Sequence, residues 1–443
     1  MNTDIHEMYK SKVKSIPEAL NVIKSNDCIL TGLGGSEPIS ILSSLHTIKD
    51  NNVMGCELIN CLPMGNYEFI KSHDYMDSIL VNGWFYTPPL RKAHAKGITT
   101  FIPQHLHQAL TKKLFTLEGR RLVLLVVCSP MDDHGYLSLS LGCTYERDAI
   151  DNGAIVIAEV NPNFPRTFGD TIVHISEIKA LVETCNEVPA LPEIPITEKD
   201  KKIGKFVAEL IEDGSTIQLG IGGIPNAVAE ALKEKKDLGI HTEMFTDGMV
   251  DLIQCGAVNN SRKTLYKGKS VATFALGSKK LYEFLDNNPS VVFLNGKWTN
   301  DPHVIGQNHK MVSINTTIEV DLFGQCASES IGPNQISGTG GQSDTAVGAQ
   351  ICPEGKSFIT LYSTAQVKNE KGEKITVSKI TPLLKQGAAV SLSRNDVDYV
   401  VTEYGVAWLR GRSVRERAER LINIAHPDFR KELREEAEKM KLL

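Results

Sequence analysis

The sequence predicts an α/β protein made of two related, open α/β/α domains with mainly parallel sheets. Two observations support this prediction. Short, nearly continuous apolar runs alternate with helical segments along the chain, which is typical of a parallel sheet covered by helices on both faces. In addition, one helix–strand–glycine-loop pattern occurs twice, which indicates a repeated structural unit.

The repeated pattern occupies residues 15–35 and 201–223. In each copy an amphipathic helix ends at a turn that contains an aspartate, and a strand follows, Cys28–Thr31 in the first copy. The strand runs into a Gly-x-Gly-Gly loop, Gly32–Gly35 in the first copy and Gly220–Gly223 in the second. We interpret the two copies as equivalent parts of two related domains.

A proline-rich segment, VPALPEIPIT at residues 188–197, lies between the copies. Three prolines at three-residue spacing favour an extended connection without a packed face. We therefore predict a first α/β domain at 1–187, a linker at 188–197, and a second α/β domain at 198–443.

Further strands are expected on both sides of this linker. The apolar runs that predict them are 121–127, 154–160, 291–295, 358–362, 388–392 and 397–402. Residues 413–441 are rich in Arg, Lys and Glu and carry apolar residues at helical spacing, which predicts helix. A basic face there could bind an acidic partner, but a solvated face behind an apolar stripe is the favoured interpretation.

Composition narrows the class of protein. The chain has 443 residues, 41% of them hydrophobic and 23% charged, as in soluble globular proteins. A net charge of -5 argues against a surface built for nucleic acid. We see neither a secretory signal nor an apolar run long enough to span a bilayer. Nine cysteines without a C-x-x-C pair indicate reduced thiols in a cytoplasm, and no zinc site.

Three glycine loops, GLGGSEP at 32, GIGGIPN at 220 and SGTGGQSD at 337, do not match known nucleotide motifs. The dinucleotide fingerprint needs a third glycine at its sixth position, where these loops carry Glu37, Pro225 and Ser343. Outward-facing amides of such loops can still hold a phosphate, a thioester oxygen or an oxyanion, although a tight turn explains any single loop equally well. His105 and His107 lack a supporting carboxylate, so we predict no metal.

The segment IHTEMFTDGMV, residues 240–250, contains the candidate nucleophile Glu243. Strand-like residues are expected to carry Glu243 to a strand end, where Asp247 and Gly248 turn the backbone and expose the carboxylate. The alternative is an ordinary solvated glutamate near a turn.

Several motifs taken in order resemble one family. They are the first Gly-x-Gly-Gly, PRTFGD, GIGGIPNAV, HTEMFTDG, TNDP, SGTGGQSD and VVTEYGVAWLRGRS. Together they resemble the acetyl-CoA hydrolase/transferase family, and within it the 4-hydroxybutyrate and butyrate CoA-transferase branch, over residues 15–430. The resemblance implies two related α/β domains with the active site at the domain interface.

The same resemblance implies roles for individual residues. Glu243 would be the catalytic glutamate, and the loop backbones would face the thioester oxygen and coenzyme A. Asn300, Gln342 and Glu403 would line or support the substrate pocket, with Asp344 as a secondary candidate. The residues assigned to the oxyanion and CoA are Gly220, Ile221, Gly222, Gly340 and Gly341.

The implied reaction is CoA transfer through a glutamyl-CoA thioester on the enzyme. Coenzyme A, as acyl-CoA, is the substrate, and the acceptor is a small carboxylate: 4-hydroxybutyrate, butyrate, acetate, or a dicarboxylate such as itaconate. Residues 60–68, NCLPMGNYE, are candidates for the acyl pocket through Met64 and Tyr67, although core packing is the favoured interpretation for Met64.

Two other functions stay open at this point. An acyl-CoA hydrolase would use the same glutamate with water as acceptor, and a non-catalytic CoA-binding protein would use the same scaffold. The resemblance also implies a homodimer or homotetramer, with no membrane or nucleic-acid partner.

Overall fold

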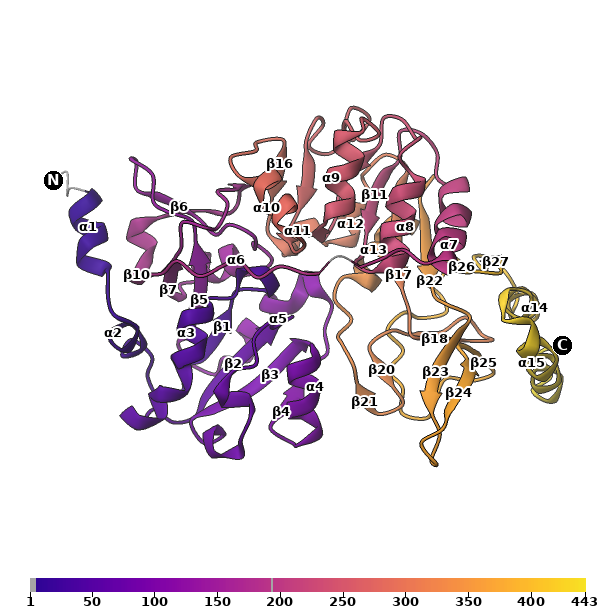
Figure 1. Ribbon diagram of the computed structural model, residues 1–443, viewed down its shortest axis with the longest axis horizontal. Coiled ribbons are helices and arrows are strands. Elements are labelled where there is room, and N and C mark those ends of the chain that lie inside the picture. Colours follow the sequence, from indigo (N-terminus) through magenta and orange to yellow (C-terminus); the bar gives the residue numbers. More distant parts are fainter. Residues whose placement is uncertain (1–4, 193) are drawn as a thin grey trace. The chain divides into compact units, whose positions relative to one another are not determined.

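The computed structural model describes residues 5–192 and 194–443, which fold into two compact units (Figure 1). The first unit contains the described residues up to Pro192 together with Glu243–Asp247 and Ser270–Thr299. The second unit contains the remainder, including Asn300–Leu443. The units are therefore not continuous in sequence, and the segment that starts at Glu243 folds with the first one.

The first unit is built on a seven-stranded sheet in which every neighbouring pair is parallel. Its strands are short and apolar; β5, with sequence LVLLVVC, is buried along its whole length. The strands, in sheet order, are β10 (Ile178–Glu183), β7 (Ile155–Val160), β5 (Leu122–Cys128), β1 (Cys28–Thr31), β2 (Cys56–Cys61), β3 (Ile79–Phe85) and β4 (Thr99–Phe101).

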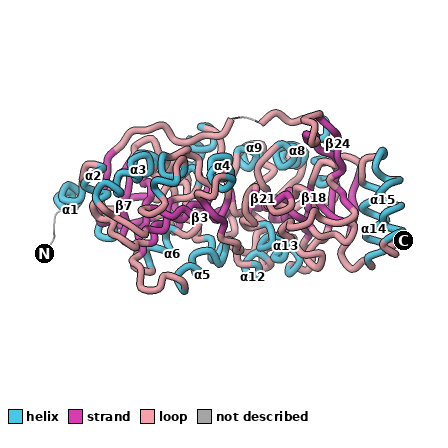
Figure 2. Tube along the Cα trace, turned by 90° about the horizontal axis from the view of Figure 1, so that it is seen from below, coloured by secondary structure: helices cyan, strands magenta, loops and turns pink. Residues whose placement is uncertain are grey.

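Helices cover both faces of this sheet, and Figure 2 shows α3 and α6 on opposite sides of it. Two apolar cores result, one beneath α2, α3 and α4 and the other beneath α5 and α6. The helices of the unit are α1 (Ile5–Lys12), α2 (Ile16–Leu20), α3 (Ile39–Ser44), α4 (Pro88–Ala95), α5 (Ala109–Phe115), α6 (Glu146–Asp151), α10 (Lys279–Leu285) and α11 (Gly296–Thr299).

Short strands complete the first unit. β13 (Met244–Phe245) pairs in parallel with β15 (Phe274–Ala275), which fixes the chain after Glu243 to the first unit. The others form a three-stranded sheet and an antiparallel pair: β14 (Ser270–Ala272), β16 (Val291–Phe293) and β8 (Phe168–Gly169), then β6 (Tyr136–Ser138) and β9 (Ile172–His174).

The second unit is built on a six-stranded sheet that is parallel except for its last strand. The strands, in sheet order, are β12 (Gly239–Ile240), β11 (Thr216–Leu219), β17 (Met311–Thr316), β22 (Lys356–Thr360), β26 (Tyr399–Thr402) and β27 (Gly405–Trp408). The predicted α/β class with mainly parallel sheets is confirmed in both units.

The helices of the second unit are α7 (Glu198–Glu209), α8 (Gly223–Ala231), α9 (Asp247–Gln254), α12 (Pro302–Ile305), α13 (Gln342–Ile351), α14 (Val414–Ile424) and α15 (Pro427–Lys439). Its smaller sheets are formed by β18 (Glu319–Asp321), β19 (Cys326–Ala327) and β25 (Ile380–Thr381), by β20 (Ser330–Ile331) and β21 (Asn334–Gln335), and by β23 (Thr364–Lys368) and β24 (Lys374–Ser378).

In both large sheets the strand order reverses at the strand that comes first in the sequence, which is β1 in the first unit and β11 in the second. The chain places β2 on one side of β1 and β5 on the other; likewise β12 and β17 flank β11. In open parallel sheets, ligands bind outside the carboxyl ends of the strands at such a switch point. Each Gly-x-Gly-Gly loop directly follows this first strand, so both loops lie where the topology favours a ligand.

One prediction about secondary structure was wrong. Residues 388–392 do not form a strand, because Leu392 makes only an isolated bridge with Cys326 while its side chain is buried in the core. The helix predicted in residues 413–441 is present as two helices, since Pro427 starts α15 after a break at Ala425–His426.

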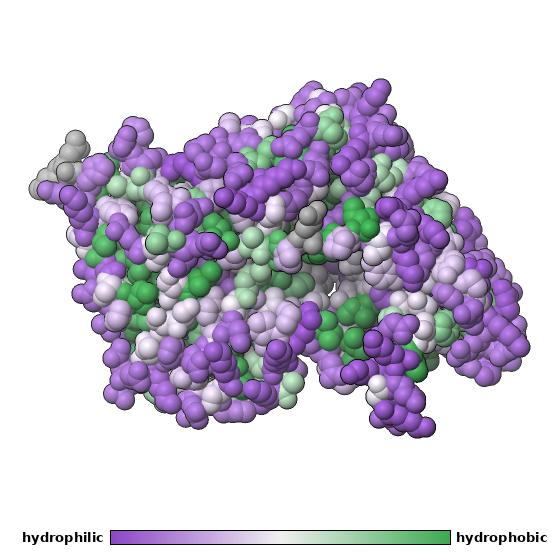
Figure 3. All heavy atoms as spheres, viewed as in Figure 1, coloured by the Kyte–Doolittle hydropathy of each residue, from purple (hydrophilic) through white to green (hydrophobic). Residues whose placement is uncertain are grey.

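The structure agrees with the favoured interpretation of residues 413–441, a solvated face behind an apolar stripe. Ala418, Leu421, Ile422 and Ala425 are buried in the core beside α14. The outer face of α14 and α15 is hydrophilic in Figure 3.

The described residues of the predicted linker 188–197 contain neither helix nor strand, as an extended connection requires; Glu193 lies outside the described residues. The division of the chain at this linker stays a prediction.

Candidate active site

Glu243 lies between the short strands β12 and β13 and is partly exposed. Its backbone carbonyl accepts hydrogen bonds from the amides of Thr273 at 2.9 Å and Phe274 at 3.1 Å. The expected local geometry was wrong in two respects. Glu243 precedes its strand rather than ending one, and Asp247 starts helix α9 instead of a turn. The two hydrogen bonds fix the backbone of Glu243, and the residue as a whole is partly exposed.

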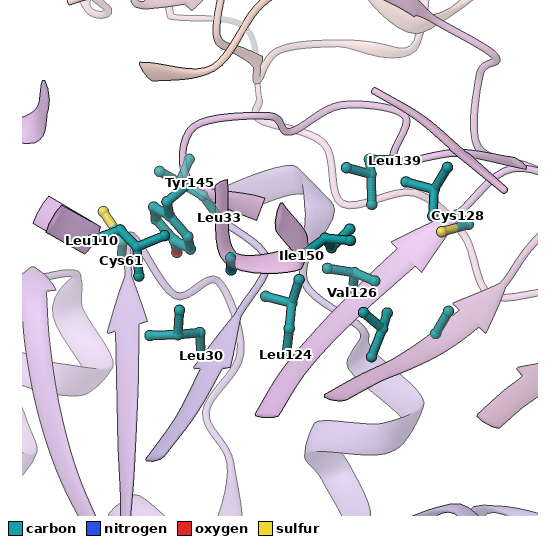
Figure 4. Close-up of a cluster of buried hydrophobic side chains, with 14 of the residues drawn as sticks. Leu30, Leu33, Cys61, Leu110, Leu124, Val126, Cys128, Leu139, Tyr145 and Ile150 are labelled. Atoms are coloured by element: carbon teal, nitrogen blue, oxygen red, sulfur yellow. The ribbon is translucent and has the colours of Figure 1, made fainter. Parts of the chain in front are cut away.

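Cys61 is a neighbour of Glu243 that sequence analysis did not identify. It ends β2 and is 4% exposed. Burial raises the pKa of the Cys61 thiol well above its ordinary value, and the charges of Glu243 and Glu146 raise it further. Figure 4 shows Cys61 at the carboxyl tip of its strand, near Leu33 and Tyr145. The nucleophile candidate therefore lies near Cys61, at the carboxyl end of β2.

The first glycine loop, Gly32–Gly35, is closed and packed. All four residues are buried. The amide of Leu33 donates to Glu146 Oε1 at 3.2 Å, and Gly32 donates to the Leu125 carbonyl at 2.8 Å. A methyl group added at Gly32 would lie 2.3 Å from the carbonyl oxygen of Ser36. The amides of Gly32 and Leu33 are thus bonded inside the protein.

Glu37 anchors the loop that sequence analysis proposed for the acyl pocket. It is 1% exposed, and its Oε2 accepts hydrogen bonds from the amides of Met64 and Gly65 and from the Tyr67 hydroxyl, at 2.7–3.2 Å. Glu37 Oε1 has no partner among the described residues. Burial raises the pKa of Glu37 to about 8, although these hydrogen bonds oppose the shift.

The packing of this loop separates its two candidate residues. Tyr67 is 5% exposed and belongs to the core, which the sequence analysis did not predict for this residue. Met64 is only partly buried against the apolar cluster.

The predicted residues of the second unit gather along the carboxyl edge of its sheet. Gly220 follows β11, Glu403 follows β26, and Gln342 donates from Nε2 to the Thr316 carbonyl at the end of β17, at 2.8 Å. Gly220 also donates to the Ile314 carbonyl of β17 at 3.3 Å. Three sequence motifs that lie far apart in the chain are thus brought to neighbouring strand ends, whereas Glu243 folds with the first unit.

The second glycine loop, Gly220–Gly223, is open, in contrast to the first. Ile221 is 41% exposed, and a methyl group added at Gly220 would meet no atom closer than 3.8 Å. The amides of Ile221 and Gly222 make no hydrogen bond to the described part of the chain. Gly222 has a φ of 123°, which L side chains rarely adopt, and it precedes the first turn of α8. This backbone is available to a ligand.

The third glycine loop ends at helix α13. Gly340 has a φ of 53°, and Gly341 is the N-cap of the helix. Gln342 and Asp344, in its first turn, are buried, and Gln342 Oε1 has no partner among the described residues. Asn300, 1% exposed, precedes Asp301, the N-cap of α12, and α12 packs on α13 through Ile305 and Gly348.

Glu403 is held as an ionised carboxylate. Burial acts to raise its pKa, but hydrogen bonds from the amide and hydroxyl of Ser363, at 2.8 and 2.9 Å, and the contact with Lys199 at 3.3 Å lower it below the ordinary value.

Two further findings concern other kinds of site. No group of three or more His, Cys, Asp or Glu among the described residues is arranged to hold a metal ion, and the rings of His105 and His107 stack 6.1 Å apart. No helix in the described residues is long and apolar enough to cross a membrane.

Comparison with known proteins places the chain in a family. Residues 1–196 match the acetyl-CoA hydrolase/transferase N-terminal domain, and residues 277–437 match the C-terminal domain of that family. The chain is 46% identical to a succinyl-CoA:cyclohexane-1-carboxylate CoA transferase of Geobacter metallireducens, over 98% of this chain and 96% of that protein. It is 43% identical to a 4-hydroxybutyrate coenzyme A transferase of Clostridium kluyveri, over 98% and 99%.

A solved structure supports the same relationship. The crystal structure of RipA from Yersinia pestis is 35% identical, with a TM-score of 0.91, and the alignment covers 100% of both chains. The predicted class of enzyme, a CoA-transferase, is confirmed by the relatives that match over their full length. The chain belongs to the acetyl-CoA hydrolase/transferase family.

Proposed function

We propose that this CoA-transferase moves coenzyme A from an acyl-CoA donor to a short-chain carboxylate through a glutamyl-CoA thioester on Glu243. The observation that supports this proposal is the setting of Glu243. Its backbone is fixed by Thr273 and Phe274, the residue is partly exposed, and it lies near the strand end occupied by Cys61.

The proposed chemistry balances without an external base. The Glu243 carboxylate attacks the donor thioester carbonyl, which gives a mixed anhydride and releases CoA as a thiolate. The thiolate attacks the glutamyl carbonyl, which forms the glutamyl-CoA thioester and frees the donor acid. An acceptor carboxylate then repeats both steps in reverse and leaves as its CoA ester. Covalent catalysis divides one exchange into steps that each pass through an oxyanion.

The glycine loops of the second unit have backbone suited to such oxyanions. Gly220, Ile221 and Gly222 lie in the open loop, and Gly340 and Gly341 lead into the first turn of α13. We assign these residues to the thioester oxygen and to CoA, and Asn300, Gln342 and Glu403 to support of the substrate.

We place an uncharged acyl group, such as butyrate, 4-hydroxybutyrate or acetate, ahead of a dicarboxylate such as itaconate. Cys61 carries no charge at neutral pH, since its pKa is raised, and Leu33 and Tyr145 lie near it. A second carboxylate would lose hydration there without an opposite charge. A cytoplasmic location and a homodimeric or homotetrameric state stay predictions.

Exchange assays test this function directly. Purified protein incubated with butyryl-CoA and a panel of short mono- and dicarboxylates should form new acyl-CoA esters, with monocarboxylates preferred. CoA release that is independent of any acceptor acid would instead identify a hydrolase. CoA binding without exchange or hydrolysis would identify a non-catalytic binding protein.

A further inference from the structure

Lys263 is a buried lysine in the loop between α9 and β14, and the proposed reaction does not use it. It is 3% exposed. Burial lowers the pKa of Lys263 to about 7, and no charged group among the described residues contributes to this shift. Lysine is almost never fully buried without a partner, because taking an ammonium group out of water costs free energy. The contacts that replace water therefore indicate what this side chain does.

Two backbone carbonyls replace water around the Lys263 ammonium group. Its Nζ donates to the Ile240 carbonyl at 2.7 Å and to the Lys269 carbonyl at 2.8 Å. Ile240 ends β12, whereas Lys269 directly precedes β14. One side chain of the second unit thus joins the backbones of two segments that are separate in sequence.

Both of these carbonyls lie next to points where the chain leaves the second unit. The chain leaves this unit directly before Glu243 and directly after Lys269. Ile240 is three residues before Glu243. After Lys269, β14 leads to the two amides that hold the Glu243 carbonyl, those of Thr273 and Phe274. The ammonium group therefore ties together the starting points of the two segments that carry Glu243 and its backbone partners.

Two further contacts connect β12 with the loop that carries Lys263. The Ile240 amide donates to Asn260 Oδ1 at 2.9 Å, so both backbone groups of Ile240 are held by this loop. Gly239 packs directly on the lysine stem, since a methyl group added there would lie 2.4 Å from Lys263 Cγ. The glycine thus leaves the space that the stem occupies.

We propose that Lys263 is a positioning residue for Glu243, because its ammonium group fixes the carbonyls from which both segments extend. This inference rests on the proposed function, in which Glu243 is the nucleophile. A nucleophile must lie close to the thioester carbonyl and in line with it, and a misplacement of about 1 Å can lower the rate about a hundredfold. Lys263 thus acts on the covalent steps and leaves the binding of acyl-CoA unchanged.

The test compares Lys263→Met with a matched control. Lys263→Met removes the ammonium group at similar length, and Lys267→Met removes an exposed charge from the same loop. Calorimetric titration with coenzyme A counts the folded sites in each preparation, and kcat is expressed per site. With butyryl-CoA and acetate, kcat per site should fall about tenfold or more in Lys263→Met, with KM little changed. Lys267→Met should match the unaltered protein.

A purely structural role for Lys263 gives a different result. Loss of folded protein lowers the number of sites and the total rate together, so kcat per site stays the same. Equal values of kcat per site in Lys263→Met and Lys267→Met would overturn the inference.

Gly239→Ala disturbs the same contacts by another route and decides the question if Lys263→Met does not fold. Gly239 lacks the positive φ that L side chains avoid, so the added methyl group acts on the lysine stem. Displacement of the stem should lower kcat per site with KM little changed. An unchanged kcat per site would contradict the role of Lys263.

Glu243→Gln separates the failure of this inference from the failure of the proposed function. If Glu243→Gln is inactive while Lys263→Met equals its control, only the role of Lys263 is overturned. Full exchange in Glu243→Gln would overturn the proposed function and the role of Lys263 with it. If the protein releases CoA without exchange, the same comparison of kcat per site applies to that release.

Discussion

The two Gly-x-Gly-Gly loops follow the first strand of their sheets at equivalent switch points, yet they differ in how their backbones are used. Gly32–Gly35 is buried, and its groups bond to Leu125 and Glu146. Gly220–Gly223 is open and leaves the amides of Ile221 and Gly222 facing a pocket. The same short pattern thus serves packing in one unit and exposes backbone to a ligand in the other.

An added methyl group should lower the stability of the protein more in the closed loop, Gly32–Gly35, than in the open loop, Gly220–Gly223. Gly32→Ala would place a methyl group 2.3 Å from the Ser36 carbonyl oxygen, which is backbone and cannot move aside cheaply. We expect the free energy of unfolding to fall by about 3 kcal/mol. Urea denaturation measures this change. A fully stable Gly32→Ala variant would contradict the description of this loop as closed.

The substitution Gly222→Ala, in the open loop, tests backbone conformation instead of packing. Its φ of 123° would cost an alanine about 2 kcal/mol, with no clash, since the nearest atom is 4.0 Å away. The loop should relax away from its present shape, so KM for acyl-CoA should rise more than the change in stability alone explains. Thermal unfolding and steady-state kinetics on one preparation check both effects. An unchanged KM would show that this loop takes no part in binding acyl-CoA.

Glu37, which follows the closed loop, gives that region a pH dependence. Its pKa is raised to about 8 from 4.5, so the folded protein binds more protons than the unfolded chain across this window. The free energy of unfolding should therefore fall as pH rises from 4.5 to 8. Glu37→Gln, which is always neutral, should flatten this part of the stability profile. An identical slope in both proteins would show that the carboxyl is ionised throughout.

The smallest effect on stability is expected at Gly220. A methyl group there meets its first neighbours at ordinary contact distance, 3.8 Å, so the free energy of unfolding should change by less than about 0.5 kcal/mol. The methyl group would still narrow the approach to the amides, and KM should increase. Gly220→Ala is the matched partner of Gly32→Ala, and equal losses of stability in the two variants would remove the contrast between the loops.

Much of the fold could be predicted because apolar runs and turn residues are local signals. Cys28–Thr31 was predicted and observed as β1, and the α/β class is confirmed. The apolar run 388–392 was wrongly predicted as a strand, since Leu392 is buried without joining a sheet. A buried apolar residue and a strand residue look the same in sequence.

The candidate site was only partly predictable. Glu243 and the glycine loops were identified by ordered motifs, whereas Cys61 and Glu37 carry no motif. Their importance comes from burial, from the partners that they have or lack, and from strand ends that meet only in three dimensions. Sequence spacing does not encode these properties.

The most direct test of the central claim is to trap the covalent intermediate. The protein is incubated with butyryl-CoA without acceptor, treated with borohydride, digested, and mapped by mass spectrometry. The account predicts that Glu243 alone is converted to the corresponding primary alcohol, and that Glu243→Gln gives no exchange and no such peptide. Reduction at another residue, or full exchange activity in Glu243→Gln, would contradict it.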